Sequence, residues 1–149
     1  MSQLNQILEQ IAAIQKTIAG VTNAFAYQVS NTSELTAPFF VNEVLGGPSD
    51  LSGGMQQRIE DLVKMCLAIA PSDSDVTLAN VNYKVITWRD VVYATFAGRV
   101  RLGNQLSFVL DARITRWGYE PRKTLGDVEW ATLVFDVPVR EWFPQTIAS

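Results

Sequence analysis

Alternation of apolar and polar side chains over the last third of the chain restricts the possible folds more than any other feature of the sequence. Residues 105–117 and residues 129–142 both follow a period of two, as in a strand with one buried face. The first run places on one face Leu106, Phe108, Leu110, Ala112 and Ile114. The second run places on one face Ala131, Leu133, Phe135, Val137 and Val139. We therefore expect two long antiparallel strands.

The two expected strands are separated by a polar stretch, which predicts an extended hairpin loop near residues 117–128. Its central part, Tyr119 to Asp127, is rich in charged and turn-forming residues and includes Arg122 and Lys123. Hairpin loops usually contain two to five residues, and a loop longer than the fold requires often contacts a partner. The alternative interpretation is a solvated turn without a partner.

Apolar residues near the N-terminus recur at spacings of three and four, which predicts an amphipathic helix over about residues 3–19. The stripe consists of Leu4, Ile7, Leu8, Ile11, Ile14, Ile18 and Val21. Ser2 is suited to cap the helix, and Gly20 is suited to the left-handed conformation that ends one. The stripe could pack on the chain's own sheet, which we favour, or against a neighbouring subunit.

The middle of the chain contains elements of three kinds. Phe39 and Val41 predict a short strand, and the glycine-rich residues 45–54 predict a flexible, exposed loop. Residues 55–70 fit a helix and a strand equally well, so periodicity does not decide between them. Residues 78–97 favour a second helix because their apolar positions keep helical spacing.

Together these elements predict one α+β domain over residues 1–149, with a mixed, mainly antiparallel sheet on which the N-terminal helix and the second helix pack. A length of 149 residues suits one domain, and 48% hydrophobic residues argue against disorder. No apolar run approaches the roughly 18 residues that predict a membrane-spanning helix, and the N-terminus does not resemble a secretory signal. The last few residues predict a short C-terminal tail.

The chain contains no His and a single Cys, which removes the commonest catalytic and metal-binding combinations. Cys66 lies in an apolar run, so we expect a buried structural thiol rather than a nucleophile. Carboxylates are the remaining catalytic option, but the adjacent Glu60 and Asp61 diverge on either a helix or a strand. The sequence therefore predicts a protein that is not an enzyme and has no catalytic, metal or cofactor site.

The net charge of −3 is distributed unevenly along the chain. Residues 1–75 carry three basic and eight acidic side chains, whereas residues 76–149 carry nine basic and seven acidic ones. A nucleic-acid-binding protein would usually show a strong basic excess, which this chain lacks. Two regions of opposite sign would suit copies that dock head-to-tail.

The order of the segments also carries a resemblance. An amphipathic helix ending in IAGVTNAFAY precedes a strand, APFFVNEV. Leu35 lies just before this strand, and Ala37-Pro38-Phe39 begin it. A long apolar segment, a helix closed by FAG and a terminal hairpin ending in LVFDVPVREW follow, with alternation from Val134 to Glu141. Over nearly the whole chain, this layout resembles the tail terminator (tail completion) proteins of long-tailed bacteriophages.

The resemblance implies a structural virion protein that forms a hexameric ring, caps the tail tube and docks it to the neck of the head. The implied partners are further copies of the chain, the tail tube or sheath protein, and neck or connector proteins. Genome DNA could pass through the lumen without specific binding, and no membrane is involved. The protein would be assembled in the host cytoplasm and reside in the tail or neck of the virion. The alternatives are a head–tail joining or neck adaptor protein and, ranked below it, a ligand-binding α+β domain.

Two segments are the expected contacts of such an assembly. The connector would use Tyr119, Arg122 and Lys123 to reach a neighbouring subunit or the tail tube, and the aromatic end would use Trp142 and Phe143. Changing Arg122 and Lys123 together to Glu is expected to weaken docking and leave the fold intact, since rim charges act mainly on association. A large aromatic side chain such as Trp142 is expected to anchor an interface more strongly.

Overall fold

The computed structural model describes residues 3–47, 49–51, 56–72, 78–104 and 106–144. Its elements, in chain order, are α1 (Gln3–Lys16), β1 (Asn23–Phe25), β2 (Phe39–Val44), β3 (Ser49–Leu51), β4 (Gln56–Pro71), α2 (Leu78–Ala97), the 3₁₀ turn η1 (Leu102–Asn104), β5 (Val109–Ala112), β6 (Arg116–Leu125) and β7 (Val128–Pro144). The predicted α+β class, with both helices packed on a mixed, mostly antiparallel sheet, is confirmed.

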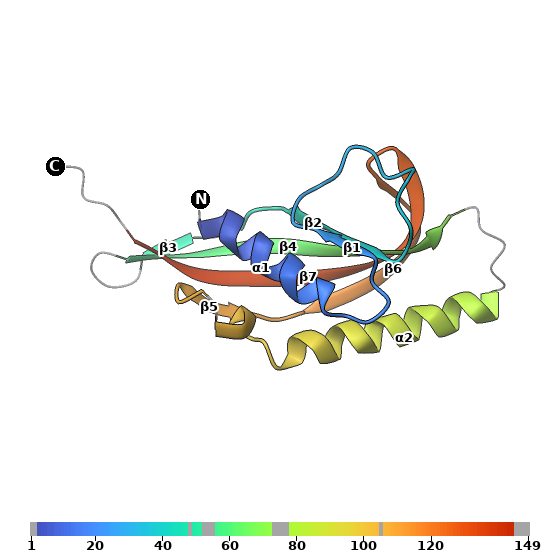
Figure 1. Cartoon of the computed structure of the whole chain (residues 1–149). Coiled ribbons are helices and arrows are strands. Elements are labelled where there is room, and N and C mark those ends of the chain that lie inside the picture. Colours follow the sequence, from blue (N-terminus) through green and yellow to red (C-terminus); the bar gives the residue numbers. More distant parts are fainter. Residues whose placement is uncertain (1–2, 48, 52–55, 73–77, 105, 145–149) are drawn as a thin grey trace.

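Two long antiparallel strands, β4 and β7, form the middle of the sheet (Figure 1). Their pairing runs from Gln56 opposite Pro144 to Pro71 opposite Trp130. On the outer side of β4 lie β2 and β3, and on the outer side of β7 lie β5 and β6. The short strand β1 pairs with β2 and is parallel to it, which makes the sheet mixed.

The two faces of the sheet are covered differently. Both helices pack on one face, where the apolar side chains of β7 form the main core. From β7 this core takes Ala131, Leu133, Phe135, Val137 and Val139, the residues that the alternation predicts. On the opposite face, the segment between β1 and β2 covers a smaller core of Phe39, Val41, Cys66, Ala68, Leu125, Trp130 and Val134. The alternation of β7 therefore supplies both cores from one strand.

The N-terminal helix packs on the chain's own sheet, as favoured. Its apolar stripe is buried, and Gln15 on the same side exchanges two side-chain hydrogen bonds, of 2.8 and 2.9 Å, with Asn42 of β2. The helix ends at Lys16, a few residues before the predicted end, and a turn follows in which the Thr17 amide donates to the Ile14 carbonyl. Gly20 has a positive φ of 92°, as expected of the residue that redirects the chain.

The ambiguous segment over 55–70 is the strand β4. Met65 and Leu67 face the helices, whereas Cys66 and Ala68 face the smaller core on the other side. A strand buried on both faces has no polar side, so its apolar residues also satisfy a helical pattern.

The other predictions for the middle of the chain have mixed outcomes. The strand near Phe39 and the helix over 78–97 are confirmed as β2 and α2. The predicted flexible loop over 45–54 is wrong for its described part, because Ser49–Leu51 form β3 and pair with β4. Backbone hydrogen bonds from Leu45 to Leu62 and from Leu62 to Gly46 also fix the preceding residues to β4. Residues 48 and 52–54 lie outside the described part.

The single strand predicted over 105–117 is wrong. Only Val109–Ala112 form a strand there, β5, and its register against β7 shifts between Val109 and Asp111. The bulge brings Val109 into the main core and leaves Leu110 out of it. The other residues of the predicted face do pack on that core: Leu106, Phe108, Ala112 and Ile114. A separate strand, β6, begins at Arg116.

The predicted extended loop at 117–128 is also wrong, because Arg116–Leu125 form β6 and pair with β7. The hairpin turn contains only Gly126 and Asp127, between the paired Leu125 and Val128. A register shift between Glu120 and Lys123 marks a bulge within β6. The predicted C-terminal tail, residues 145–149, lies outside the described residues. Among the residues described, no helix is long and apolar enough to cross a membrane.

Candidate interface surfaces

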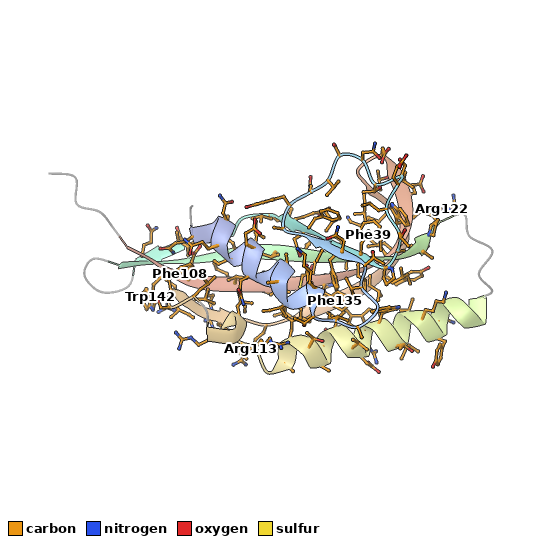
Figure 2. All side chains as sticks on the ribbon, in the orientation of Figure 1. Phe39, Phe108, Arg113, Arg122, Phe135 and Trp142 are labelled. Atoms are coloured by element: carbon orange, nitrogen blue, oxygen red, sulfur yellow. The ribbon has the colours of Figure 1, made fainter. Side chains whose placement is uncertain are left out.

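The five residues predicted to form an interface do not lie together. Tyr119 and Lys123 both belong to β6, but Tyr119 packs against the main core, and its burial raises the pKa of its phenol. Arg122 is exposed at the bulge of β6. Figure 2 shows Arg122 and Trp142 at opposite ends of the sheet. Phe143 belongs to β7, but its side chain lies outside the described part.

Lys123 is held in a group of charges rather than presented to a partner. Its Nζ atom lies 3.8 Å from a carboxylate oxygen of Glu43 on β2 and 3.7 Å from one of Glu120 on its own strand. The Lys123 side chain is only 20% exposed. The lysine therefore balances two carboxylates on the face of the sheet opposite the helices.

This placement changes the expected outcome for the double variant. Arg122→Glu should leave the free energy of unfolding within about 0.5 kcal/mol of the parent, because the side chain is exposed. Lys123→Glu should lower it by about 1 kcal/mol or more, because three carboxylates then share one site. Urea denaturation at low and high salt tests both, and salt should reduce the loss for Lys123→Glu. Equal stabilities for the two variants would contradict the described charge group.

At the other end of the sheet, Trp142 is partly buried on β7. The Arg58 guanidinium of β4 lies 5.4 Å from the centre of its indole ring, as expected for a cation–π contact between directly opposite residues. The neighbouring Glu141 is buried and accepts a 2.8 Å hydrogen bond from Gln3 of α1. Burial raises the pKa of the Glu141 carboxyl, and the nearby Asp61 adds to the effect. These contacts attach the start of α1 to the end of β7.

A polar network joins the β6–β7 turn to the segment between β1 and β2. The Thr32 amide donates to Asp127 over 2.7 Å, and the Thr32 hydroxyl donates to the Leu125 carbonyl over 2.6 Å. The indole N–H of Trp130 in turn donates to the Thr32 hydroxyl over 2.9 Å. An open hollow of about 510 Å³ lies beside this network, and Gln28, Ser30, Glu43 and Thr124 are among its lining residues.

The outer side of α2 exposes three large apolar side chains among polar ones such as Lys84, Thr87 and Asp90. Tyr83, Ile86 and Val91 are 73%, 50% and 37% exposed, and all three lie on this helix. The inner side packs on the sheet through Val85, Val92 and Phe96. The sequence carries a signal for this surface, because the apolar residues of α2 also occupy positions between those of its buried stripe. The sequence-based prediction of interface residues missed it.

A second hollow, of about 260 Å³, lies at the C-terminal end of α2. Its lining consists of Tyr93, Phe96, Ala97, Arg113 and Ile114. The Arg113 side chain is 67% exposed, and its Nε atom lies 3.3 Å from a carboxylate oxygen of Asp111. The hollow therefore combines a mainly apolar lining with one exposed guanidinium, and we call it the α2 pocket.

The sheet face opposite the helices carries alternating charges where the smaller core does not cover it. Asp136 of β7 lies between Lys64 of β4 and Arg116 of β6 in the pairing, and Arg140 lies opposite Glu60. Charges of both signs thus lie side by side, and this face does not form a basic surface for nucleic acid. In the part of the chain that the structure describes, no group of three or more Cys, Asp or Glu side chains is placed to hold a metal ion.

Cys66 is fully buried between β2 and β7. Burial, with a smaller contribution from the Glu43 carboxylate, raises the pKa of its thiol to about 12. The Cys66 thiol is therefore protonated at neutral pH. Only the deprotonated thiolate is reactive, so Cys66 is unreactive in the folded protein.

The raised pKa predicts that Cys66 will not react with a thiol-specific reagent in the folded protein at pH 8, and that one equivalent will react after unfolding in guanidinium. An unfolded Cys has a pKa of about 8.5. Between about pH 9 and 12 the unfolded chain therefore loses a proton that the folded chain retains, so Cys66 should make the free energy of unfolding fall as the pH rises. Rapid labelling of the folded protein would contradict this placement.

Comparison with known proteins does not assign the chain to a family: no protein-family model matches it, and no curated protein matches its sequence.

Proposed function

We propose that this chain is a structural protein of a long-tailed bacteriophage, and that it forms a ring at the head–tail junction which caps the tail tube and docks it to the neck. Six copies per ring follow from the resemblance of the sequence to tail terminator proteins. The order of elements supports the proposal, because an N-terminal helix, a proline-led strand, a second helix and a terminal hairpin also follow one another in the structure.

The observation that carries the proposal is the set of three large apolar side chains exposed on the outer side of α2. Here the sheet covers one side, and Tyr83, Ile86 and Val91 remain exposed on the other. Exposed apolar side chains close to one another, such as Tyr83 and Ile86, can contribute to an interaction surface. An assembly protein would need such a surface, whereas the chemistry of an enzyme would not.

The edge of strand β6 is unsuited to pairing with a strand of another subunit, so contacts between subunits would use side chains. Among the described strands β6 pairs only with β7, so its outer edge is open to another strand in principle. The bulge between Glu120 and Lys123 and the proline at position 121 interrupt that edge. Both features are typical of edges that do not add a further strand. The assembly we propose is therefore built through helices and side chains.

The proposal is tested on the purified protein and on tails from a phage mutant that lacks it. Native mass spectrometry and negative-stain images should show a six-membered ring, either alone or at one end of the tail tube. Labelled protein should bind to the end of the tube that faces the head and restore joining to heads. A chain that stays monomeric at every concentration and also fails to bind tails would overturn the proposal.

The position of the label distinguishes a terminator from a neck adaptor. Tails and heads can be prepared separately from mutants blocked in joining. A terminator is expected on isolated tails and absent from isolated heads. Binding to isolated heads alone would make the chain a neck adaptor.

A further inference from the structure

We propose that Glu141 and Asp61 share one proton in the folded protein, and that loss of this proton as the pH rises loosens the attachment of α1 to the end of β7. The start of α1 and the end of β7 lie at the same end of the sheet (Figure 1). This pH-sensitive attachment is a property of the single chain, so it does not depend on the proposed ring.

The Glu141 carboxyl is buried without a cation beside it. Glu141 is 3% exposed and follows Val137 and Val139 at the two-residue spacing of β7, so its side chain points to the face that the helices cover. Among the described side chains, no Lys or Arg forms an ion pair with Glu141. An ionised carboxylate removed from water is strongly disfavoured unless a cation pairs with it. The geometry therefore favours the protonated form of Glu141.

A second carboxyl lies next to Glu141 on the same face of the sheet. Glu141 is opposite Ile59 in the β4–β7 pairing, and Asp61 is two residues further along β4, which makes it the diagonal neighbour of Glu141. Burial raises the pKa of the Glu141 carboxyl most, a hydrogen bond from Gln3 lowers it, and Asp61 raises it through its charge and a hydrogen bond. Two adjacent carboxyls do not readily ionise together, so the pair retains one proton to a higher pH than an isolated carboxyl would.

The charged residues of α1 and β4 near this end of the sheet do not neutralise the pair. The first charged residue of α1 is Glu9, six residues after Gln3 and about 9 Å further along the helix axis. On β4, Arg58 and Glu60 are an odd number of residues from Asp61, so their side chains point to the opposite face. In the described parts of these two elements, no cation therefore faces the pair.

The residues of β5 and β7 around the pair do not neutralise it either. Val109 of β5 lies opposite Glu141 and is apolar. The exposed Arg101 donates from its Nε atom to the Val109 carbonyl, and Arg140 of β7 forms an ion pair with Asp111. Within the described residues, a proton rather than a cation therefore balances one of the two carboxyls.

Gln3 connects the carboxyl pair to α1. Its Nε2 atom donates to the Glu141 carboxyl over 2.8 Å and to the Trp142 carbonyl over 3.0 Å. The Trp142 amide in turn donates to the Phe108 carbonyl, which holds the end of β7 in place. When both carboxyls are ionised they repel each other, and Glu141 is stabilised by moving towards water. Such a movement shifts both acceptors of Gln3, so the first turn of α1 loosens together with the end of β7.

The direction of the pH dependence follows from the raised pKa of Glu141. The closed attachment keeps a proton at a pH at which the open or unfolded chain, with the ordinary pKa of 4.5, has lost it. The stabilisation is therefore complete below pH 4.5 and is lost as the pH rises through the pKa of the folded protein. Each unit by which the folded pKa exceeds the ordinary value weakens the attachment about tenfold in total.

Two NMR measurements on the full chain test this switch. The carboxyl ¹³C shift of Glu141 should titrate with a midpoint above 4.5. Amide exchange of Ile7 and Leu8, whose N–H groups donate to carbonyls of the first turn of α1, reports the attachment. After correction for the intrinsic pH dependence of exchange, their protection should fall between about pH 4 and 8, by about tenfold for each unit by which the midpoint exceeds the ordinary pKa.

Glu141→Gln is the decisive variant, because an amide has the shape of the protonated carboxyl but no charge. It should keep the protection of the parent at low pH and show no fall at high pH. Asp61→Asn should lower the Glu141 midpoint and reduce the fall. The matched control Glu129→Gln, at an exposed carboxyl on the same strand, should leave the midpoint and the fall as they are in the parent.

A Glu141 midpoint at or below 4.5 would overturn the proposal. A fall in protection that is equal in Glu141→Gln and in the parent would also overturn it, because the responsible group would then lie elsewhere. If Glu141→Gln does not fold, the titrations of the parent and of Asp61→Asn still decide whether the two carboxyls share a proton. None of these outcomes depends on assembly, so they leave the proposed ring to its own test.

Discussion

Replacing Phe135 by Ala is expected to lower the free energy of unfolding by about 3–5 kcal/mol. Phe135 is fully buried near the middle of β7, opposite Met65 of β4 on one side and Trp117 of β6 on the other. Its ring also meets Tyr93 of α2 edge to face, with 6.0 Å between the ring centres. The truncation would leave a cavity where the sheet and α2 meet.

Urea denaturation followed by tryptophan fluorescence measures this loss. Phe135→Leu should lose substantially less, because leucine refills much of the volume. Ile86→Ala, at a half-exposed position on α2, should change the stability of the dilute protein by no more than about 0.5 kcal/mol. A loss below about 1 kcal/mol for Phe135→Ala would mean that this part of the core can collapse around the missing ring.

Replacing Gly126 by Ala is expected to have the second largest effect, a loss of about 2–4 kcal/mol. Gly126 occupies the β6–β7 turn with a φ of +67°, a conformation that L residues rarely adopt. A Cβ there would lie 2.5 Å from the Val29 carbonyl oxygen and 2.9 Å from the Ser30 carbonyl. The turn would have to move away from the segment that Thr32 ties to it.

Gly46→Ala is the matched control for this substitution. Gly46 also has a positive φ, of 73°, but an added Cβ would meet no atom within 4 Å. Gly46→Ala should therefore show the backbone strain alone, about 1 kcal/mol. Denaturation curves of both variants give the difference, which measures how tightly the turn is packed. Equal losses would show that the turn can shift at no cost.

The parts of the fold that the sequence predicts well are those with an unbroken period. β7 alternates clearly from Ala131 to Val139 because one face packs on the main core, whereas the other face carries Asp136 and Arg140 beyond the smaller core. The stripe of α1 likewise keeps helical spacing because it has a single buried side. In such segments the hydrophobic pattern shows directly which residues are buried and which are exposed.

The wrong predictions concern β5 and β6, where a bulge or an exposed edge breaks the relation between the hydrophobic pattern and burial. In β5 the register shift places Val109 and Ala112 in the core, a spacing of three that no regular strand produces. β6 carries Pro121 and several charged side chains because it lies at the side of the sheet, and this composition resembles a loop. Whether such a segment forms a strand depends on the strand with which it pairs, and a single sequence does not show which strands pair.

The candidate interface was harder to predict than the fold. Charged loops and terminal aromatic residues suggested Lys123 and Trp142, but the structure gives both of them partners within the chain. Tyr83 was not among the residues predicted to form an interface. Its exposure depends on the angle at which α2 meets the sheet, and side-chain spacing alone does not determine that angle.

The central strand β7 is also the last described strand to leave the ribosome. Until it emerges, β4 has no partner on its inner side, and residues such as Met65 and Leu67 lack the strand that completes their surroundings. The two-residue turn lets β6 and β7 pair quickly, but pairing with β4 must close a loop that includes all of α2. A nascent chain in which β7 has not yet emerged would expose the apolar side chains of β4, so the sheet is completed only when β7 pairs with β4.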